Sequence, residues 1–188
     1  MNKLTNGQRL QEAYRLCIEP YSKHLQVALT LTLKQTARIG VKRFRNYGNE
    51  YFYYSHKLDE ERLLSTIRYF NVLLTKELFG NQARHKNKQL WAKPLVITAV
   101  EGRNINKLTH IHSAIGNIPK EHISSIESII KLIWAKCDFA NKEICIKHLY
   151  DSNGWLNYIT KEVGYTDNDA LEVCHSVIPQ YIQSSICT

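Results

Sequence analysis

Two groups of residues in this sequence have the side chains and the spacing to do chemistry. His110 and His112 stand two positions apart, and two imidazoles at that spacing can bind one divalent metal ion. Tyr158 is followed three positions later by Lys161, which places a phenol near a cation. The ordinary pKa of a tyrosine is about 10, so the phenol needs a nearby positive charge to become a good nucleophile. Together the two groups could carry out a metal-assisted nucleophilic attack.

The histidine pair requires a strand to position it. In a strand, residues two positions apart point to the same face, so His110 and His112 would project together while Ile111 enters the core. Two ligands rarely suffice, and Glu101, which closes the preceding apolar run, is the expected third ligand. If Glu101 pairs opposite Leu108, it falls on the histidine face. Such a set suits Mg²⁺ or Mn²⁺.

The same residues also fit a simpler interpretation. The two histidines could lie on the surface of an edge strand, with Glu101 an ordinary residue of a hairpin, because short motifs discriminate weakly. His148 could replace Glu101 as a ligand, although a structural role suits it better.

The tyrosine group requires a helix. Residues three positions apart share a helix face, and a helix is expected over about 154–163. Tyr158 and Lys161 would then lie side by side, while Tyr165 and Trp155 are expected to be structural. Taken alone, the pair also fits an amphipathic helix with a packed tyrosine and a solvated lysine. A paired-histidine strand followed by a helix, a strand and this pair arises much less often by accident.

The remaining pattern predicts the elements around these groups. Apolar runs with β-branched residues predict strands, and apolar residues at three- and four-residue intervals predict helices. The expected strands are 25–33, 94–101, 108–116 and 143–149, and the expected helices are 6–18, 59–79, one that opens at 119, and 154–163. The order from residue 25 is β-α-β-β-α-β, which predicts an α+β, ferredoxin-like antiparallel sheet. We expect helices on one face and the active site on the other, with an N-terminal helix and a C-terminal tyrosine-bearing helix added. The stretch 38–54 stays unassigned.

Length and composition indicate one domain. The chain has 188 residues, with a core at about 25–163, an N-terminal helix within 1–20 and a C-terminal extension at 164–188. No apolar run is long enough to cross a bilayer and no secretory signal is visible, so we expect a cytoplasmic protein without a membrane partner. The net charge of +8 favours a polyanionic partner such as nucleic acid.

In this order, the motifs resemble those of the HUH endonuclease superfamily, which comprises rolling-circle replication initiators, relaxases and single-tyrosine transposases. The run 28–33 (ALTLTL) is similar to the first-strand motif of the initiators. Glu101 with 110–112 (HIH) is similar to the metal motif, and 158–162 (YITKE) to the tyrosine motif. The resemblance covers about residues 25–163. It is greatest to single-tyrosine replication initiator (Rep) proteins of bacterial plasmids, filamentous phages or related mobile elements.

The resemblance implies a metal-dependent enzyme that nicks and rejoins single-stranded DNA at a replication origin. Tyr158 would form a covalent 5′-phosphotyrosine link, with Lys161 as a second catalytic residue, and Glu101, His110 and His112 would hold Mg²⁺ or Mn²⁺. The chain has no G-x-x-x-x-G-K-[ST] motif, so a host helicase and polymerase would unwind and copy the DNA. A single-tyrosine transposase or a relaxase-like strand transferase remains an open alternative.

Basic and aromatic residues in two segments could bind the DNA. Single strands are usually held by a basic groove with aromatic rings on which bases stack, and 43–54 and 84–88 offer both ingredients. Arg43, Arg45 and Arg84 are the candidate DNA contacts. A noncatalytic nucleic-acid-binding module of ferredoxin-like fold is a second hypothesis, but its K/R-G-F/Y-G/A-F-V motif is not found in the sequence. The oligomeric state and the target sequence stay open.

Overall fold

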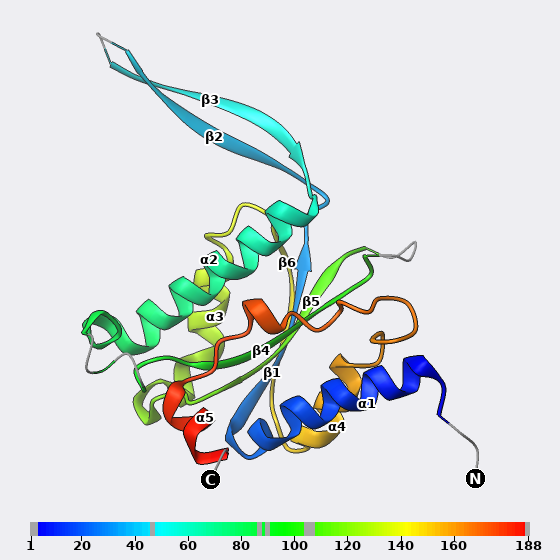
Figure 1. Ribbon diagram of the computed structural model, residues 1–188. Helices are drawn as coiled ribbons and strands as arrows, with labels where there is room; N and C mark the ends of the chain where they lie inside the picture. The colour runs from blue at the N-terminus through cyan, green and yellow to red at the C-terminus, as the bar shows by residue number, and fades with distance from the viewer. Residues whose placement is uncertain (1–3, 46–47, 86–87, 89–90, 104–107, 187–188) are drawn as a thin grey trace.

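A four-stranded antiparallel sheet forms the centre of the fold (Figure 1). Its strands lie in the order β4-β5-β1-β6 and span β1 (Leu25–Leu33), β4 (Leu95–Glu101), β5 (His110–Gly116) and β6 (Ala140–His148). All four strands expected from the sequence are therefore present. The computed structural model describes residues 4–45, 48–85, 88, 91–103 and 108–186, with the backbone alone inside 41–51 and at 185 and 186.

One face of the sheet is covered by two helices, α2 (Glu60–Phe79) and α3 (Ile126–Trp134). Helix α2 begins after Asp59, whose side chain accepts a hydrogen bond from the Arg62 backbone N–H, and it ends at Gly80, which has a φ of 51°. The helical spacing expected over 59–79 is confirmed, because the side chains that face the sheet are Leu63, Ile67, Phe70, Leu74 and Leu78. They pack against four buried residues of β1, namely Val27, Leu29, Leu31 and Leu33.

Three further helices cover the opposite face: α1 (Asn6–Ile18), α4 (Ser152–Ile159) and α5 (Gln180–Ile186). Leu156 and Ile182 join Leu95 and Ile97 of β4 in a second hydrophobic cluster on this face. The expectation that this face would be free is wrong where these helices pack. Strand β4 is buried along its whole length, so it needs apolar partners on both faces. The fold is α+β and is compatible with a ferredoxin-like arrangement.

The C-terminal segment pairs with the outer edge of β4. Val96 and Val177 exchange two backbone hydrogen bonds of 2.7 Å, and the Val100 N–H donates to the Ala170 carbonyl at 2.7 Å. These bonds satisfy backbone groups that an edge strand would otherwise leave open. The segment after the tyrosine helix is thus part of the sheet edge rather than an appendage.

The unassigned stretch forms a long antiparallel hairpin, which we call the arm: β2 (Thr36–Arg45) and β3 (Gly48–Lys57). Figure 1 shows the arm projecting away from the sheet and the helices. At its base, Ala37 is buried and faces the core, whereas Arg38 and Tyr53 lie on the opposite, exposed face. Most of the described side chains of the arm are exposed, and such a ribbon needs no regular apolar alternation, which explains why the sequence pattern did not reveal it.

Short 3₁₀ helices connect the main elements. They are η1 (Glu19–His24), η2 (Gly80–Arg84), η4 (Lys120–Ser125) and η5 (Val173–His175). The helix expected to open at 119 therefore starts with a 3₁₀ segment, and α3 proper begins at Ile126. Within the described ranges, no helix combines the length and the apolar character that crossing a bilayer requires.

Candidate metal and tyrosine site

The three expected metal ligands meet at the end of two neighbouring strands. Glu101 is the last residue of β4, and it pairs directly with His110, the first residue of β5. His112 is opposite Ala99 and lies on the same face. The expected pairing of Glu101 with Leu108 is wrong by two positions, because β5 begins only at His110. A two-residue shift of register keeps Glu101 on the same face of the sheet as the histidines, so the expected grouping of the three residues is retained.

The ligand atoms are close enough to share one ion. Oε2 of Glu101 lies 2.9 Å from Nε2 of His112 and 3.5 Å from Nε2 of His110. One ligand atom from each residue lies within 4.8 Å of the others. Glu101 and His112 are buried, and His110 is half-buried. Two imidazoles and one carboxylate converge here in an arrangement that could hold a metal ion.

The partners of the histidine rings fit this role. Nδ1 of His110 lies 3.0 Å from the Leu108 carbonyl oxygen and donates to it, which leaves Nε2 to face Glu101. Nδ1 of His112 lies 2.9 Å from Oγ1 of Thr30, on the neighbouring strand β1. Such outer hydrogen bonds orient metal-binding histidine rings. Both Nε2 atoms therefore turn toward Glu101.

The charges of the group also suit a cation. Burial lowers the pKa of His112 to about 4, and the nearby His110 adds to the effect, against the opposing influence of Glu101. Burial would raise the pKa of Glu101, but the hydrogen bond and the charge of Lys161, together with His112, lower it to about 2. At neutral pH the group therefore holds a neutral His112 and an ionised Glu101, which are the states that bind metals.

Helix α4 brings Tyr158 to the metal group. Its side chains Leu156 and Ile159 are buried against the sheet, which fixes the direction in which Tyr158 points. The Tyr158 ring meets the His112 ring edge to face, with centres 5.0 Å apart, and it stacks on Trp155 at 5.1 Å. Tyr158 is 40 % exposed, so part of the residue can be reached from solvent while its ring is held.

Trp155 acts as the packing residue expected from the sequence. Its indole N–H donates to the Ser113 carbonyl at 3.2 Å, and its ring packs against the second hydrophobic cluster. Because the indole is anchored to β5, it fixes the position of the Tyr158 ring that stacks on it.

Lys161 joins the two halves of the site. Its Nζ lies 2.6 Å from Oε2 of Glu101 and 3.7 Å from the centre of the Tyr158 ring. The expected helix over 154–163 is too long, since α4 ends at Ile159 and Lys161 lies in the turn that follows. Thr160 leaves helical geometry, and its hydroxyl donates to the Leu156 carbonyl at 2.9 Å. The structure thus brings together all five residues expected at the metal and tyrosine site.

The other candidates lie elsewhere. Arg43 and Arg45 are in β2, but their side chains lie outside the described residues. Arg84 is exposed and follows the C-terminal end of α2. That helix has 20 residues and is about 30 Å long. His148 pairs with Val27, which faces the opposite side of the sheet, so it cannot serve as a ligand here. Tyr165 is 60 % exposed, and its expected structural role has no support from burial.

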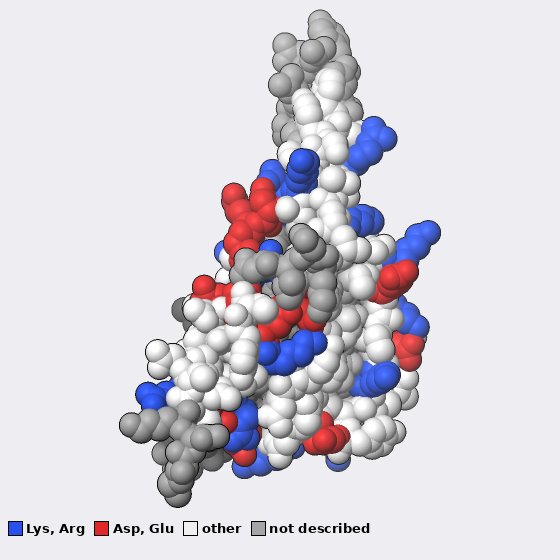
Figure 2. Space-filling model, turned by 90° about the vertical axis from the view of Figure 1, so that its right-hand side faces the viewer, with Lys and Arg blue, Asp and Glu red and all other residues white. Residues whose placement is uncertain are grey.

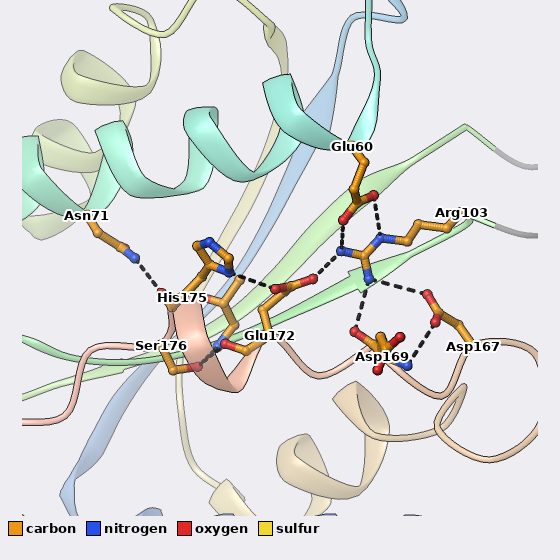
Figure 3. A network of polar contacts seen from close by, with 9 residues as sticks. Glu60, Asn71, Arg103, Asp167, Asp169, Glu172, His175 and Ser176 are labelled. Atoms are coloured by element: carbon orange, nitrogen blue, oxygen red, sulfur yellow. Dashed lines mark hydrogen bonds and ion pairs between the residues drawn. The ribbon is translucent and has the colours of Figure 1, made fainter.

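A second polar cluster beside the site was not anticipated. Arg103, two residues after Glu101, binds Glu60 of α2 at 2.8 Å, and it also binds Asp167 and Glu172 of the C-terminal segment (Figure 3). The cluster extends from Glu172 to His175 at 2.9 Å. It ties the turn after Glu101 to two distant parts of the chain. Because these partners are far apart in the sequence, no local pattern could have revealed them.

Comparison of the chain with protein-family models, with curated proteins and with solved structures finds no match in any of the three. The fold and the site define an α+β protein with a buried group that could hold a metal ion beside a half-exposed tyrosine.

Proposed function

We propose that this protein is a metal-dependent enzyme that nicks and rejoins single-stranded DNA through Tyr158. One observation carries the proposal: a carboxylate, two imidazoles, a lysine and a tyrosine converge on one point from β4, β5, α4 and the turn after α4. An arrangement that served only packing would not require this combination of charges at the end of a sheet.

The frame that we propose is ferredoxin-like, with the arm inserted between the first strand and the first helix. The element order β1, α2, β4, β5, α3, β6 and the strand order β4-β5-β1-β6 support it. The frame and the order of the motifs together support a place in the HUH endonuclease superfamily, as a single-tyrosine replication initiator of a plasmid, phage or mobile element.

The geometry suggests how the residues would divide the work. Glu101, His110 and His112 would hold a divalent ion, which would stabilise negative charge on the scissile phosphodiester. The Tyr158 oxygen would form a bond to phosphorus as the bond to the 3′-oxygen breaks, leaving a 5′-phosphotyrosine and a free 3′-hydroxyl. A later attack by a 3′-hydroxyl would reverse the step, so the energy of the broken bond is retained and no nucleotide is needed. Lys161 would offset charge on the phenolate.

The arm is the part of the surface that we propose to bind DNA near the site. In the sequence, 36–57 contains five Lys and Arg residues and one Glu, which is half of the net charge of +8. Tyr53 is 61 % exposed on the outer face of the arm, with the guanidinium of Arg38 5.8 Å from its ring centre. Figure 2 shows that basic side chains elsewhere on the visible face are scattered among acidic ones, so on this face the charge of the body marks no DNA path.

The arm is fixed to the body beside the site. At its base His56 lies 3.1 Å from Arg62 of α2, and Glu60 of the same helix binds Arg103. This connection would hold DNA on the arm in a set position relative to Tyr158. Alanine at Tyr53 and Arg38 should weaken DNA binding in a fluorescence-anisotropy titration without changing metal binding.

Capture of covalent adducts tests the proposed function without knowledge of the target sequence. The protein is incubated with Mn²⁺ and a randomised single-stranded DNA library, denatured, and the DNA that stays attached is sequenced. We expect adducts enriched in one sequence, lost in Tyr158→Phe and retained in Tyr165→Phe, which removes an exposed tyrosine seven positions away. Adducts that persist in Tyr158→Phe would refute the nucleophile. Binding without any adduct, under either Mg²⁺ or Mn²⁺, would favour a noncatalytic nucleic-acid-binding module.

A further inference from the structure

We propose that the Lys161 ammonium and a divalent metal ion compete for the same place beside Glu101, so that metal loading transfers Lys161 to Tyr158. The inference rests on the metal site of the proposed function and adds a device that couples the ion to the nucleophile. It begins from one atom, Oε2 of Glu101, which both Lys161 and the histidines approach.

The three approaches leave no separate place for an ion. Nζ of Lys161 lies 2.6 Å from Oε2, and the Nε2 atoms of His112 and His110 lie 2.9 Å and 3.5 Å from it. A metal ion bound by this oxygen and both nitrogens would lie about 2 Å from each. An ammonium that kept its place would then be within a few ångströms of a doubly charged ion in a buried site, where like charges repel strongly. Lys161 must therefore leave Oε2 when the ion binds.

Lys161 is able to move. It lies in the turn after α4 rather than inside a helix, and its side chain is 38 % exposed. A lysine side chain has four rotatable carbon–carbon bonds, so the ammonium can change partner without a change of the backbone. Other contacts hold the backbone of this turn, such as the 3.0 Å hydrogen bond from the Gln11 side chain to the Thr160 carbonyl, so only the Lys161 side chain has to move.

Tyr158 is the nearest group that can receive the displaced ammonium. Nζ already lies 3.7 Å from the centre of the Tyr158 ring and interacts with its phenol, so only a short movement is needed. In the metal-free protein Glu101 and Tyr158 share the ammonium, and in the loaded protein it would stabilise the phenolate alone. The nucleophile would thus have the whole cation only when the ion needed for the reaction is in place.

Metal affinity without DNA tests this competition. Mn²⁺ binding is measured by the loss of the free-ion electron paramagnetic resonance signal, for the unchanged protein and for Lys161→Gln. We expect Lys161→Gln to bind Mn²⁺ about tenfold more tightly, because the competing cation is gone. Lys161→Arg, which keeps the charge, should remain close to the unchanged protein. Lys147→Gln is the matched control, since Lys147 is exposed on β6 and its removal alters net charge equally.

A spectroscopic readout follows the transfer itself. Titration with Mg²⁺ should produce a tyrosine difference spectrum in the near ultraviolet that disappears in Tyr158→Phe and in Lys161→Gln. Equal or weaker Mn²⁺ binding by a folded Lys161→Gln, or the same gain in Lys147→Gln, would overturn the competition. These readouts need no cleavage of DNA. If the protein binds metal in this way but forms no DNA adduct, the competition stands and the proposed function fails.

Discussion

The rings of His112 and Tyr158 meet edge to face with their centres 5.0 Å apart. His112 comes from the middle of β5 and Tyr158 from α4, so the contact joins a candidate metal ligand to a candidate nucleophile across 46 positions of the chain. Lys161 also links the two groups, because its ammonium contacts both Glu101 and the Tyr158 ring. The two groups are therefore parts of one site, and substitutions in either should affect the other.

Replacing His112 with alanine should abolish tight metal binding. The substitution removes one of three ligands and leaves Glu101 paired with Lys161, so we expect the affinity for Mn²⁺ to fall by at least about 100-fold. Isothermal titration calorimetry measures the change. His148→Ala is the control, because His148 is exposed on the opposite face of the sheet and should leave the affinity unaltered. Equal losses in both variants would contradict the assignment of the ligands.

Thr30 should support the metal group without touching the ion. Its hydroxyl lies 2.9 Å from Nδ1 of His112, and the loss of such an outer partner typically lowers metal affinity 10- to 100-fold, so we expect about tenfold for Thr30→Val. Thr32→Val is a matched control in the same strand, because the Thr32 hydroxyl donates to the Glu143 carbonyl instead. If Thr32→Val weakens metal binding as much as Thr30→Val in the same calorimetric measurement, the supporting role assigned to Thr30 is contradicted.

The metal-free protein should lose stability as the pH falls from about 6.5 to 4. The pKa of His112 is about 4 in the folded protein and 6.5 ordinarily, so the unfolded chain takes up a proton in this range that the folded protein refuses. The loss is of the order of 3 kcal/mol, because one pKa unit corresponds to about 1.4 kcal/mol. Glu101, with a pKa of about 2, should add a further loss between about pH 4.5 and 2.

Urea unfolding in the presence of a chelator, at about pH 7, 5.5, 4 and 2.5, measures this dependence. His112→Asn should flatten the curve between pH 6.5 and 4 and leave the more acidic limb in place. An unchanged slope in His112→Asn would mean that other groups cause the acid sensitivity.

Arg103 should contribute mainly to stability. Its side chain is 13 % exposed and holds Asp167 and Glu172, which would be left buried without the guanidinium in Arg103→Ala. Removal of one partner from such a group costs about 3 kcal/mol or more in the free energy of unfolding. Lys131→Ala breaks an exposed pair with Glu127 and should cost less than about 1 kcal/mol. Similar losses in the two variants, measured by urea unfolding, would show that the Arg103 cluster has no special role.

Much of the site could be predicted because it depends on local spacing. Two histidines at i and i+2 share a strand face, whatever the sheet contains, and a glutamate at the end of the previous strand reaches the same face after any even shift of register. The elements 6–18 and 25–33 also match α1 and β1, since their apolar spacing is regular.

The remaining features depend on contacts between distant segments. Lys161 reaches Glu101 only because α4 docks on the sheet, and Arg103 finds its partners only because the C-terminal segment returns along β4. The arm was missed for a different reason, since most of its described side chains are exposed and burial imposes no regular pattern on them. Neither the docking of distant segments nor an exposed hairpin changes the local spacing of apolar residues, so neither can be predicted from that spacing.

The most direct measurement for the central claim is to locate the covalent bond. A DNA adduct formed with Mn²⁺ is digested with nuclease and protease, and mass spectrometry identifies the residue that carries the nucleotide remnant. We predict the remnant on Tyr158, in a yield that falls to background when His112 is replaced by alanine. A remnant on Tyr165 or on any other residue, or adduct formation that is indifferent to His112, would contradict the account.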